Sequence, residues 1–206
     1  MAGYQSTLFA PNALSLAPVT HSARHDLGHG AWIDHVPDWV LDANAVFDAL
    51  VRDVPWRAER RPMYDRVVAV PRLVSWYAAG APLPHPMLEE CRDHLSRHYL
   101  PNLGEPLVTA GMCFYRDGND SVAWHGDNIK GGHPLNTVVA ILSFGAERSL
   151  SLRPRGGGES MRFPMAHGDL LVMGGSAQRT WEHAVLKTTR PVGPRISVQF
   201  RTSGVF

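Results

Sequence analysis

The sequence predicts an α+β protein in which helices of the N-terminal half cover a C-terminal β-sandwich or barrel. Two stretches before Pro101 have the apolar spacing of amphipathic helices. After Pro101 the chain consists of short β-prone runs separated by turns, as expected for a closed antiparallel arrangement. The 16 prolines and 19 glycines supply many turns and favour short strands over long helices.

The length of 206 residues suits one compact domain, since domains usually contain roughly 100–200 residues. Residues 1–40 are expected to form an N-terminal extension, because the first thirty are loop-like, with scattered His and Pro. A division into two domains near Pro101 is the alternative. It is disfavoured because the helices need a sheet to cover their apolar faces.

Two helices are expected in the N-terminal half. The first, DANAVFDALVRDV, has Asp42 as its N-cap and ends at Pro55. Its apolar stripe comprises Val46, Phe47, Leu50, Val51 and Val54. The second lies in PHPMLEECRDHLSRHYL, where Pro86 suits the first turn. Its apolar face comprises Leu88, Cys91, Leu95 and Tyr99.

The runs after Pro101 have the length and composition of strands. Each is rich in apolar or β-branched residues and is bounded by Gly, Pro or Asn. They are LVTAGMCFY, NTVVAILSF, RSLSLRP, SMRFPM, DLLVMGG and RISVQFR.

Charge and cysteine content exclude several classes. The formal net charge is only +1, so nucleic-acid binding would need a local basic patch. Cys91 and Cys113 lie far apart without CxxC spacing, which excludes a disulfide framework and a cysteine zinc site. The first residues do not resemble a signal peptide, and no apolar run approaches the ~20 residues that span a bilayer. We expect a cytoplasmic protein without membrane association.

A metal-binding motif is present in AWHGDN. His125 and Asp127 are two residues apart, so on an extended segment both side chains project from the same face. His183, in RTWEHAVLK, is the best third ligand because it lies at an expected strand entry after the β-rich stretch. Two histidines and one carboxylate form the facial triad of non-haem iron oxygenases. His133 and His167 are the competing third ligands.

The last predicted strand, RISVQFR, alternates strictly between polar and apolar residues. Its polar face comprises Arg195, Ser197, Gln199 and Arg201. One interpretation is a solvated face. The other is a polar face turned into the mouth of a barrel, where the planar fork of Arg195 would bind a dicarboxylate.

The chain resembles the AlkB family of nucleic-acid dealkylating dioxygenases. The resemblance rests on the ordered motifs YRDG, WHGD, LSFG, HGDLLVM, WEHAV and PRISVQFR, and more weakly on MYDRVVAVPRLVSWY. It implies a double-stranded β-helix (jelly-roll) core over residues 105–206, buttressed by the N-terminal helices. It also implies a shortened substrate lid over residues 60–85, because the family's tyrosine-rich segment is missing after WYAAG.

The same resemblance implies that the three candidate ligands hold Fe(II), with 2-oxoglutarate and O₂ as cosubstrates. Arg195 would pair with the distal carboxylate of 2-oxoglutarate, Arg201 would act near its metal-side carboxylate, and Tyr115 would form a hydrogen bond with the cosubstrate. Two positions depart from the family pattern. Cys113 and Ser197 stand where asparagine is frequent, so cosubstrate binding is expected to be weaker or differently arranged.

Several further residues are candidates for contact with the nucleic acid. These are Trp76, Tyr77, Trp124, Ile129, Arg153 and Arg155. The aromatic residues offer stacking surfaces for bases. Ile129 stands at a position that is often acidic in the AlkB family, where the acidic residue helps to choose the base. The two arginines lie in the glycine-rich loop RPRGGG, which is either a nucleic-acid contact or a solvated hairpin tip.

The resemblance therefore predicts a monomeric enzyme that repairs alkylated DNA or RNA by oxidative dealkylation. A dioxygenase of the same fold acting on a tRNA base, a protein or a small molecule is the main alternative. A non-catalytic β-barrel binding module is a third. It is disfavoured because all three metal ligands and both arginines are present.

Overall fold

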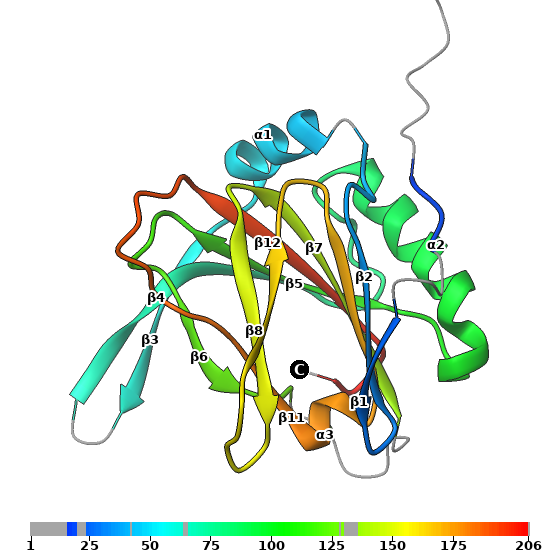
Figure 1. The fold of residues 1–206 in the computed structure, drawn as a ribbon. Helices are drawn as coiled ribbons and strands as arrows, with labels where there is room; N and C mark the ends of the chain where they lie inside the picture. Colours follow the sequence, from blue (N-terminus) through cyan, green and yellow to red (C-terminus); the bar gives the residue numbers. More distant parts are fainter. Residues whose placement is uncertain are drawn as a thin grey trace, which may run out of the picture.

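The computed structural model is a β-sandwich whose two longer helices lie on one outer face (Figure 1). It describes residues 16–19, 24–41, 43–63, 66–127, 129 and 136–205. Within these ranges the strands form an eight-stranded and a four-stranded sheet. No helix in the same ranges is long and apolar enough to cross a membrane.

The larger sheet has the order β1-β2-β10-β7-β12-β5-β4-β3. Its strands are β1 (Arg24–Gly28), β2 (Ala31–Val36), β3 (Arg57–Met63), β4 (Arg66–Tyr77), β5 (Thr109–Tyr115), β7 (Thr137–Gly145), β10 (Leu170–Gly175) and β12 (Arg195–Arg201). The smaller sheet has the order β6-β11-β8-β9. Its strands are β6 (Val122–His125), β8 (Arg148–Pro154), β9 (Met161–Met165) and β11 (Trp181–Val185). The predicted jelly-roll core and all six strands foreseen after Pro101 are confirmed.

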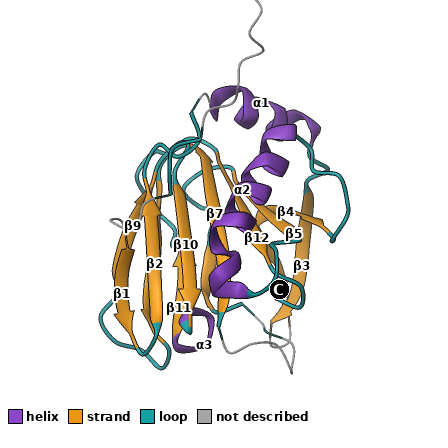
Figure 2. Cartoon of the chain, turned by 90° about the vertical axis from the view of Figure 1, so that its right-hand side faces the viewer, coloured by secondary structure: helices purple, strands orange, loops and turns teal. Residues whose placement is uncertain are grey.

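Helices α1 (Ala43–Asp53) and α2 (Pro86–Leu103) lie over one face of the larger sheet (Figure 2). Both were predicted, and the four residues expected on the apolar face of α2 are all fully buried. Gly104 ends α2 in a left-handed conformation with φ 71°, which glycine adopts without strain. In α1 the apolar stripe is narrower than expected, because Val51 is 40% exposed. The expected N-cap, Asp42, lies outside the described residues.

The helices and the larger sheet share a single apolar core. It joins residues of α1 and α2 to side chains of the sheet strands β5, β7, β10 and β12. A domain boundary near Pro101 would cut through this core. A second apolar cluster fills the space between the two sheets and includes Tyr115, Leu152 and Val185.

The expectation that residues 1–40 form an extension is wrong for residues 24–36. They form β1 and β2, and β2 pairs with β10 inside the larger sheet. Polar residues within AWIDHV concealed this strand. Asp34 is fully buried, and hydrogen bonds satisfy its carboxylate: Arg24 donates two of 2.7 Å and the Tyr99 hydroxyl donates another of 2.8 Å.

The predicted lid segment, residues 60–85, overlaps β3 and β4. These strands pair with each other, and β4 pairs with β5, so they extend the larger sheet at its edge. This segment therefore consists largely of a sheet hairpin followed by a loop that leads to α2. Its role as a substrate lid stays a prediction.

Strand β12 lies between β7 and β5, and its two faces meet different surroundings. Its apolar face packs into the core beneath the helices. Its polar face is turned inward: Arg195 is 1%, Ser197 3% and Arg201 8% exposed. The interpretation of RISVQFR as the lining of an interior is confirmed, and the solvated alternative is wrong.

Candidate metal centre and cosubstrate pocket

Strands β6 and β11 place two histidines opposite each other. His125 and His183 are direct partners in the antiparallel ladder, and their ring centroids are 4.2 Å apart. Asp127 follows two residues after the last residue of β6. One donor atom from each of the three residues lies within 4.8 Å of the others. The structure thus brings together the three ligands expected from the sequence.

The competing third ligands do not join this group. The His167 ring accepts a 2.8 Å hydrogen bond from the Gly145 backbone N–H through Nδ1, in the turn before β10. His133 lies outside the described residues. Among the residues that the structure describes, only His125, Asp127 and His183 form a group with metal-ligand spacing.

The tautomer of His125 follows from its hydrogen bond. Its Nδ1 lies 2.8 Å from the Ala123 carbonyl oxygen, which can only accept. The proton therefore resides on Nδ1, and Nε2 keeps a free lone pair for a metal ion. A backbone carbonyl is a common outer partner of metal-binding histidines, because it fixes the ring orientation.

His183 is buried and neutral. Burial, reinforced by the nearby His125, lowers its pKa from 6.5 to about 3. A neutral imidazole is the form that binds a metal ion. The site is therefore ready for metal near neutral pH without the release of a proton from His183.

This pKa predicts a pH dependence of stability. Below pH 6.5 the unfolded chain protonates His183, while the folded chain does so only near pH 3. As the pH is lowered from 6.5 toward 3, the free energy of unfolding of the metal-free protein should therefore decrease. This residue contributes up to about 1.4 kcal/mol per pH unit to the decrease. Urea denaturation of the native chain and of His183→Asn between about pH 6 and pH 4 measures the difference. Parallel pH profiles of the two proteins would contradict the burial argument.

Asp127 is held by Arg201. The Arg201 Nε donates at 2.8 Å to one carboxylate oxygen, and Nη2 donates at 3.3 Å to the other. Burial alone would raise the pKa of Asp127, but the charge of Arg201, with smaller help from His183, lowers it below its ordinary value. Asp127 is thus ionised and oriented. Arg201, expected beside the cosubstrate, here contacts a metal ligand directly.

Arg195 lies on the same strand face and has an incomplete set of partners. Its Nε donates to the Ser143 hydroxyl at 2.9 Å, whereas its buried Nη1 has no hydrogen-bond partner in the described part of the chain. Tyr115 lies opposite on β5, with its ring centroid 5.5 Å from the guanidinium carbon. Burial lowers the pKa of Arg195. A buried guanidinium without a carboxylate is costly, so an anionic ligand fits this position.

Arg148 completes the surroundings of Tyr115 and was not foreseen. It donates to the backbone carbonyls of Asp117 (2.9 Å), Asp120 (3.0 Å) and Leu186 (2.7 Å), and its guanidinium carbon lies 5.8 Å from the Tyr115 ring centroid. It thereby ties the loop after β5 to the end of β11. Its only signal in the sequence is its place as the first residue of the expected strand RSLSLRP.

The two positions that depart from the family pattern are neighbours. Cys113 and Ser197 are direct partners across β5 and β12. Arg72 of β4 donates to the Cys113 sulfur at 3.3 Å, and Gln199 donates to the Ser197 hydroxyl. Arg72 was not selected from the sequence. It brings a further guanidinium to the inner surface of β5.

Trp76 and Tyr77, the two aromatic candidates of β4, lie on opposite faces of the strand. Trp76 is 46% exposed and lies on the inner face of β4, since a Cβ on Gly111 would lie 3.4 Å from it and 2.9 Å from Arg201. Tyr77 packs instead against the core beneath the helices. Only Trp76 is therefore placed on the side of the metal centre. Ile129 forms an isolated bridge with Val205.

Arg153 and Trp124 contact each other on the smaller sheet. The Arg153 guanidinium donates twice to Glu182, at 3.0 and 2.8 Å, and lies 4.4 Å from the Trp124 ring centroid. Trp124 and Glu182 each precede a histidine of the candidate triad, so they face the opposite side of the sheet. Arg155 is exposed and donates to the Gln178 carbonyl at 3.3 Å. Contacts of these arginines with nucleic acid stay a prediction.

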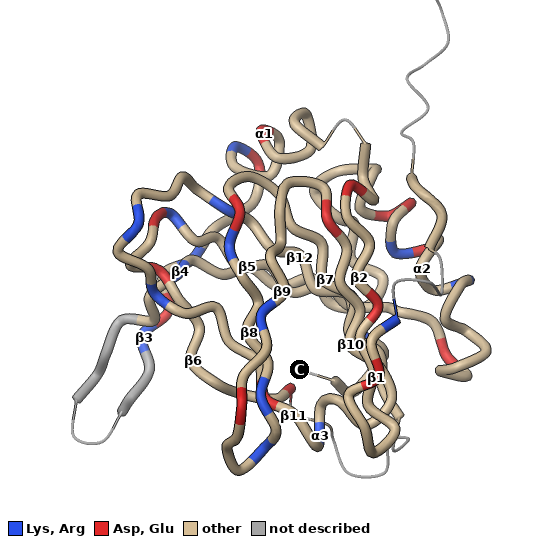
Figure 3. The backbone as a smooth tube through the Cα atoms, viewed as in Figure 1, with Lys and Arg blue, Asp and Glu red and all other residues tan. Residues whose placement is uncertain are grey.

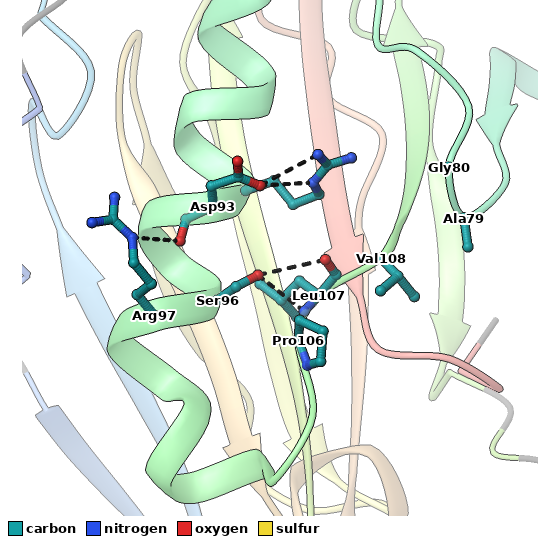
Figure 4. A pocket seen from close by; sticks show the side chains of 9 residues that line it. Ala79, Gly80, Asp93, Ser96, Arg97, Pro106, Leu107 and Val108 are labelled. Carbon is teal, nitrogen blue, oxygen red and sulfur yellow. Dashed lines mark hydrogen bonds and ion pairs between the residues drawn. The ribbon is translucent and has the colours of Figure 1, made fainter.

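The charge distribution agrees with the low net charge. Basic and acidic positions are interspersed along the described chain (Figure 3). A hollow of about 570 Å³ lies against α2, lined among others by Arg92, Arg97 and Leu107 (Figure 4). Both arginines donate hydrogen bonds to Asp93 within it. None of the residues that line it belongs to the candidate site.

Comparisons with known proteins agree with this geometry. The model of the 2OG-Fe(II) oxygenase superfamily matches residues 82–201. Alpha-ketoglutarate-dependent dioxygenase alkB homolog 3 of Bos taurus is 33% identical over 183 residues, which cover 78% of this chain and 62% of that protein. DNA oxidative demethylase ALKBH2 of Homo sapiens is 28% identical over 183 residues, covering 78% and 68%.

The solved structure of OsALKBH1 superposes with a TM-score of 0.61 at 13% identity, covering 82% of this chain and 97% of that one. At this identity the likeness bears on the fold alone. The chain spans about three fifths of the length of the alkB homolog 3 proteins that it matches.

Proposed function

Because the chain belongs to the AlkB family of the 2OG-Fe(II) oxygenase superfamily, we propose that it removes alkyl groups from damaged nucleobases by oxidation. One observation carries the enzymatic part of this proposal. The three ligand side chains converge at one end of an interior polar surface. The same surface holds Arg195, whose buried Nη1 has no hydrogen-bond partner in the described part of the chain. A metal site and a carboxylate anchor are what this class of oxygenase requires.

The residues present fit the implied cofactor and cosubstrate. Fe(II) bound by His125, Asp127 and His183 would supply the oxidation of an alkyl C–H bond by O₂, coupled to conversion of 2-oxoglutarate to succinate and CO₂. The two histidines offer neutral nitrogen donors and Asp127 offers an anionic oxygen. Arg195 would bind the distal carboxylate of 2-oxoglutarate, beside Tyr115.

Burial adds a second contribution. Asp127 is 6% and His183 7% exposed, and apolar side chains fill the space between the sheets around them. Such surroundings limit the access of water to the reacting groups, which protects a strongly oxidising centre from side reactions.

The substrate part of the proposal rests on the relatives. One of them is named as a DNA oxidative demethylase, and an alkyl group on a base nitrogen is a substrate that oxidation at carbon releases as an aldehyde. Trp76, half exposed on the side of the metal centre, offers a stacking surface for an unpaired base. We therefore place the protein in the repair of alkylated DNA or RNA.

A single assay tests both parts. Protein purified without oxygen is supplied with Fe(II), ascorbate, 2-oxoglutarate and O₂, together with an oligonucleotide that carries 1-methyladenine or its unmethylated twin. We expect succinate and formaldehyde to rise in equal amounts, and only with the methylated strand. Succinate without dependence on the methyl group would redirect the proposal to another substrate. Absence of succinate from protein with bound iron would overturn the enzymatic part.

A further inference from the structure

We propose that Gln178 is a positioning residue that fixes the Asp127 ligand against helix α3 (Ala177–Thr180) and so presets the metal centre before the ion binds. The inference rests on the proposed metal site. It concerns a residue that contacts neither the metal position nor the cosubstrate pocket directly, and that acts through the backbone of a ligand.

The contact itself is buried and specific. Gln178 is 2% exposed, and its side-chain oxygen accepts a 3.0 Å hydrogen bond from the Asp127 backbone N–H. Its amide nitrogen donates to the Met173 sulfur at 3.8 Å, which orients the amide group. A buried backbone N–H that loses its partner carries the full cost of desolvation. The side-chain oxygen of Gln178 therefore satisfies the buried backbone N–H of Asp127.

The position of Gln178 links two parts of the triad. Helix α3 leads directly into β11, which carries His183 five residues after Gln178. On the other side, the ladder between β6 and β11 contains only two residue pairs, with a register shift between them. Beyond His125 the chain has left this ladder. The hydrogen bond from Gln178 therefore connects Asp127 to the segment that carries His183.

Asp127 is held at both ends as a result. Arg201 binds its carboxylate, while Gln178 binds its backbone. Gly126, between the two ligands of the motif, packs closely against the same helix. A Cβ at this position would lie 2.7 Å from the Gln178 carbonyl oxygen and 2.6 Å from an Arg155 guanidinium nitrogen. The motif and α3 thus form one tightly packed unit.

The test measures binding of Mn(II), a divalent ion suited to imidazole and carboxylate ligands, by electron paramagnetic resonance. Gln178→Met keeps the side-chain length but removes the strong acceptor. We expect it to raise the Kd for Mn(II) by about 10–100-fold, as for other outer partners of metal ligands. Gln178→Glu keeps an oxygen acceptor at the same reach, so its Kd should lie much closer to the native value.

Ser96→Ala is the matched control. The Ser96 hydroxyl accepts a hydrogen bond from the Leu107 backbone N–H at 3.0 Å, which is also buried but lies on the helix side of the sheet. It should destabilise the fold to a similar degree, as judged by the Tm of the metal-free protein, and leave the Kd for Mn(II) unchanged. An equal rise of Kd in both variants would show a merely structural role and overturn the inference.

A native Kd in Gln178→Met would also overturn the inference, while the proposed function would stand. If Gln178→Met does not fold, Gly126→Ala takes its place, because the added methyl group forces the motif away from α3. Its Kd is expected to rise, and an unchanged Kd overturns the inference. Failure of the native chain itself to bind Mn(II) would instead remove the proposed metal centre, and the inference with it.

Discussion

Replacement of Arg195 by methionine is expected to raise the Kd for 2-oxoglutarate by about 10²–10³-fold. Loss of one member of a buried, hydrogen-bonded charge pair typically costs 2–5 kcal/mol or more, roughly this range. Arg195 is 1% exposed, and its Nη1 has no partner in the described part of the chain. A carboxylate that enters the pocket therefore meets a donor that no protein group already satisfies.

Calorimetric titration of 2-oxoglutarate into the Mn(II)-loaded protein, without oxygen, measures this effect. The Kd for Mn(II) serves as an internal control and should not change, because Arg195 does not contact the triad. Arg195→Lys keeps the charge but loses the planar fork, so its Kd for 2-oxoglutarate should lie between those of the native chain and Arg195→Met. Without cosubstrate, the methionine variant should melt at a higher temperature than the native chain, since an unpaired buried charge is removed. A native Kd for 2-oxoglutarate in Arg195→Met would refute the assignment of this anchor.

Replacement of Asp127 by alanine should have two large effects. Succinate formation should fall below detection, because the triad loses its only anionic ligand. The free energy of unfolding should fall by about 3–5 kcal/mol, because Arg201 is left buried without its carboxylate. The double variant Asp127→Ala/Arg201→Met should regain part of this stability and none of the activity. Urea denaturation and the succinate assay provide the two readouts.

Asp53→Ala offers a matched control for the stability effect. Arg52 and Asp53 form the same two-point pair, at 2.8 Å for both hydrogen bonds, but on the surface of α1. Solvent screens such a pair, so its loss should leave both stability and activity close to native. An equal loss of stability in Asp53→Ala and Asp127→Ala would mean that burial is not the source of the effect.

The central parts of the site could be predicted because they follow the two-residue period of strands. The alternation of RISVQFR placed Arg195 and Arg201 together, and the two-residue spacing of the motif brought Asp127 to His125, although Asp127 lies just beyond the end of β6. The period does not tell whether a polar face meets water or an interior. That distinction depends on what packs over the face, and here the polar face of β12 is turned into the space between the two sheets, where Arg195, Ser197 and Arg201 are buried.

The remaining contacts join residues far apart in sequence, and no local pattern indicates them. Gln178 reaches Asp127 across 51 positions, and Tyr99 reaches Asp34 across 65. The second contact explains why β2 was not predicted, since a buried aspartate interrupts an otherwise apolar strand. Trp76 and Tyr77, both candidates for stacking, lie on opposite faces of β4 for a simpler reason. Adjacent residues of a strand point to opposite faces.

The position of β12 also bears on how the protein is made. Strand β12 follows all the other strands along the chain, yet it pairs with both β5 and β7 in the middle of the eight-stranded sheet. While residues 195–201 are still within the ribosome, β5 and β7 each lack a neighbour and present an unpaired edge. Such edges are prone to association with other chains. Completion of the sheet, and delivery of both arginines to the site, must therefore follow synthesis of β12.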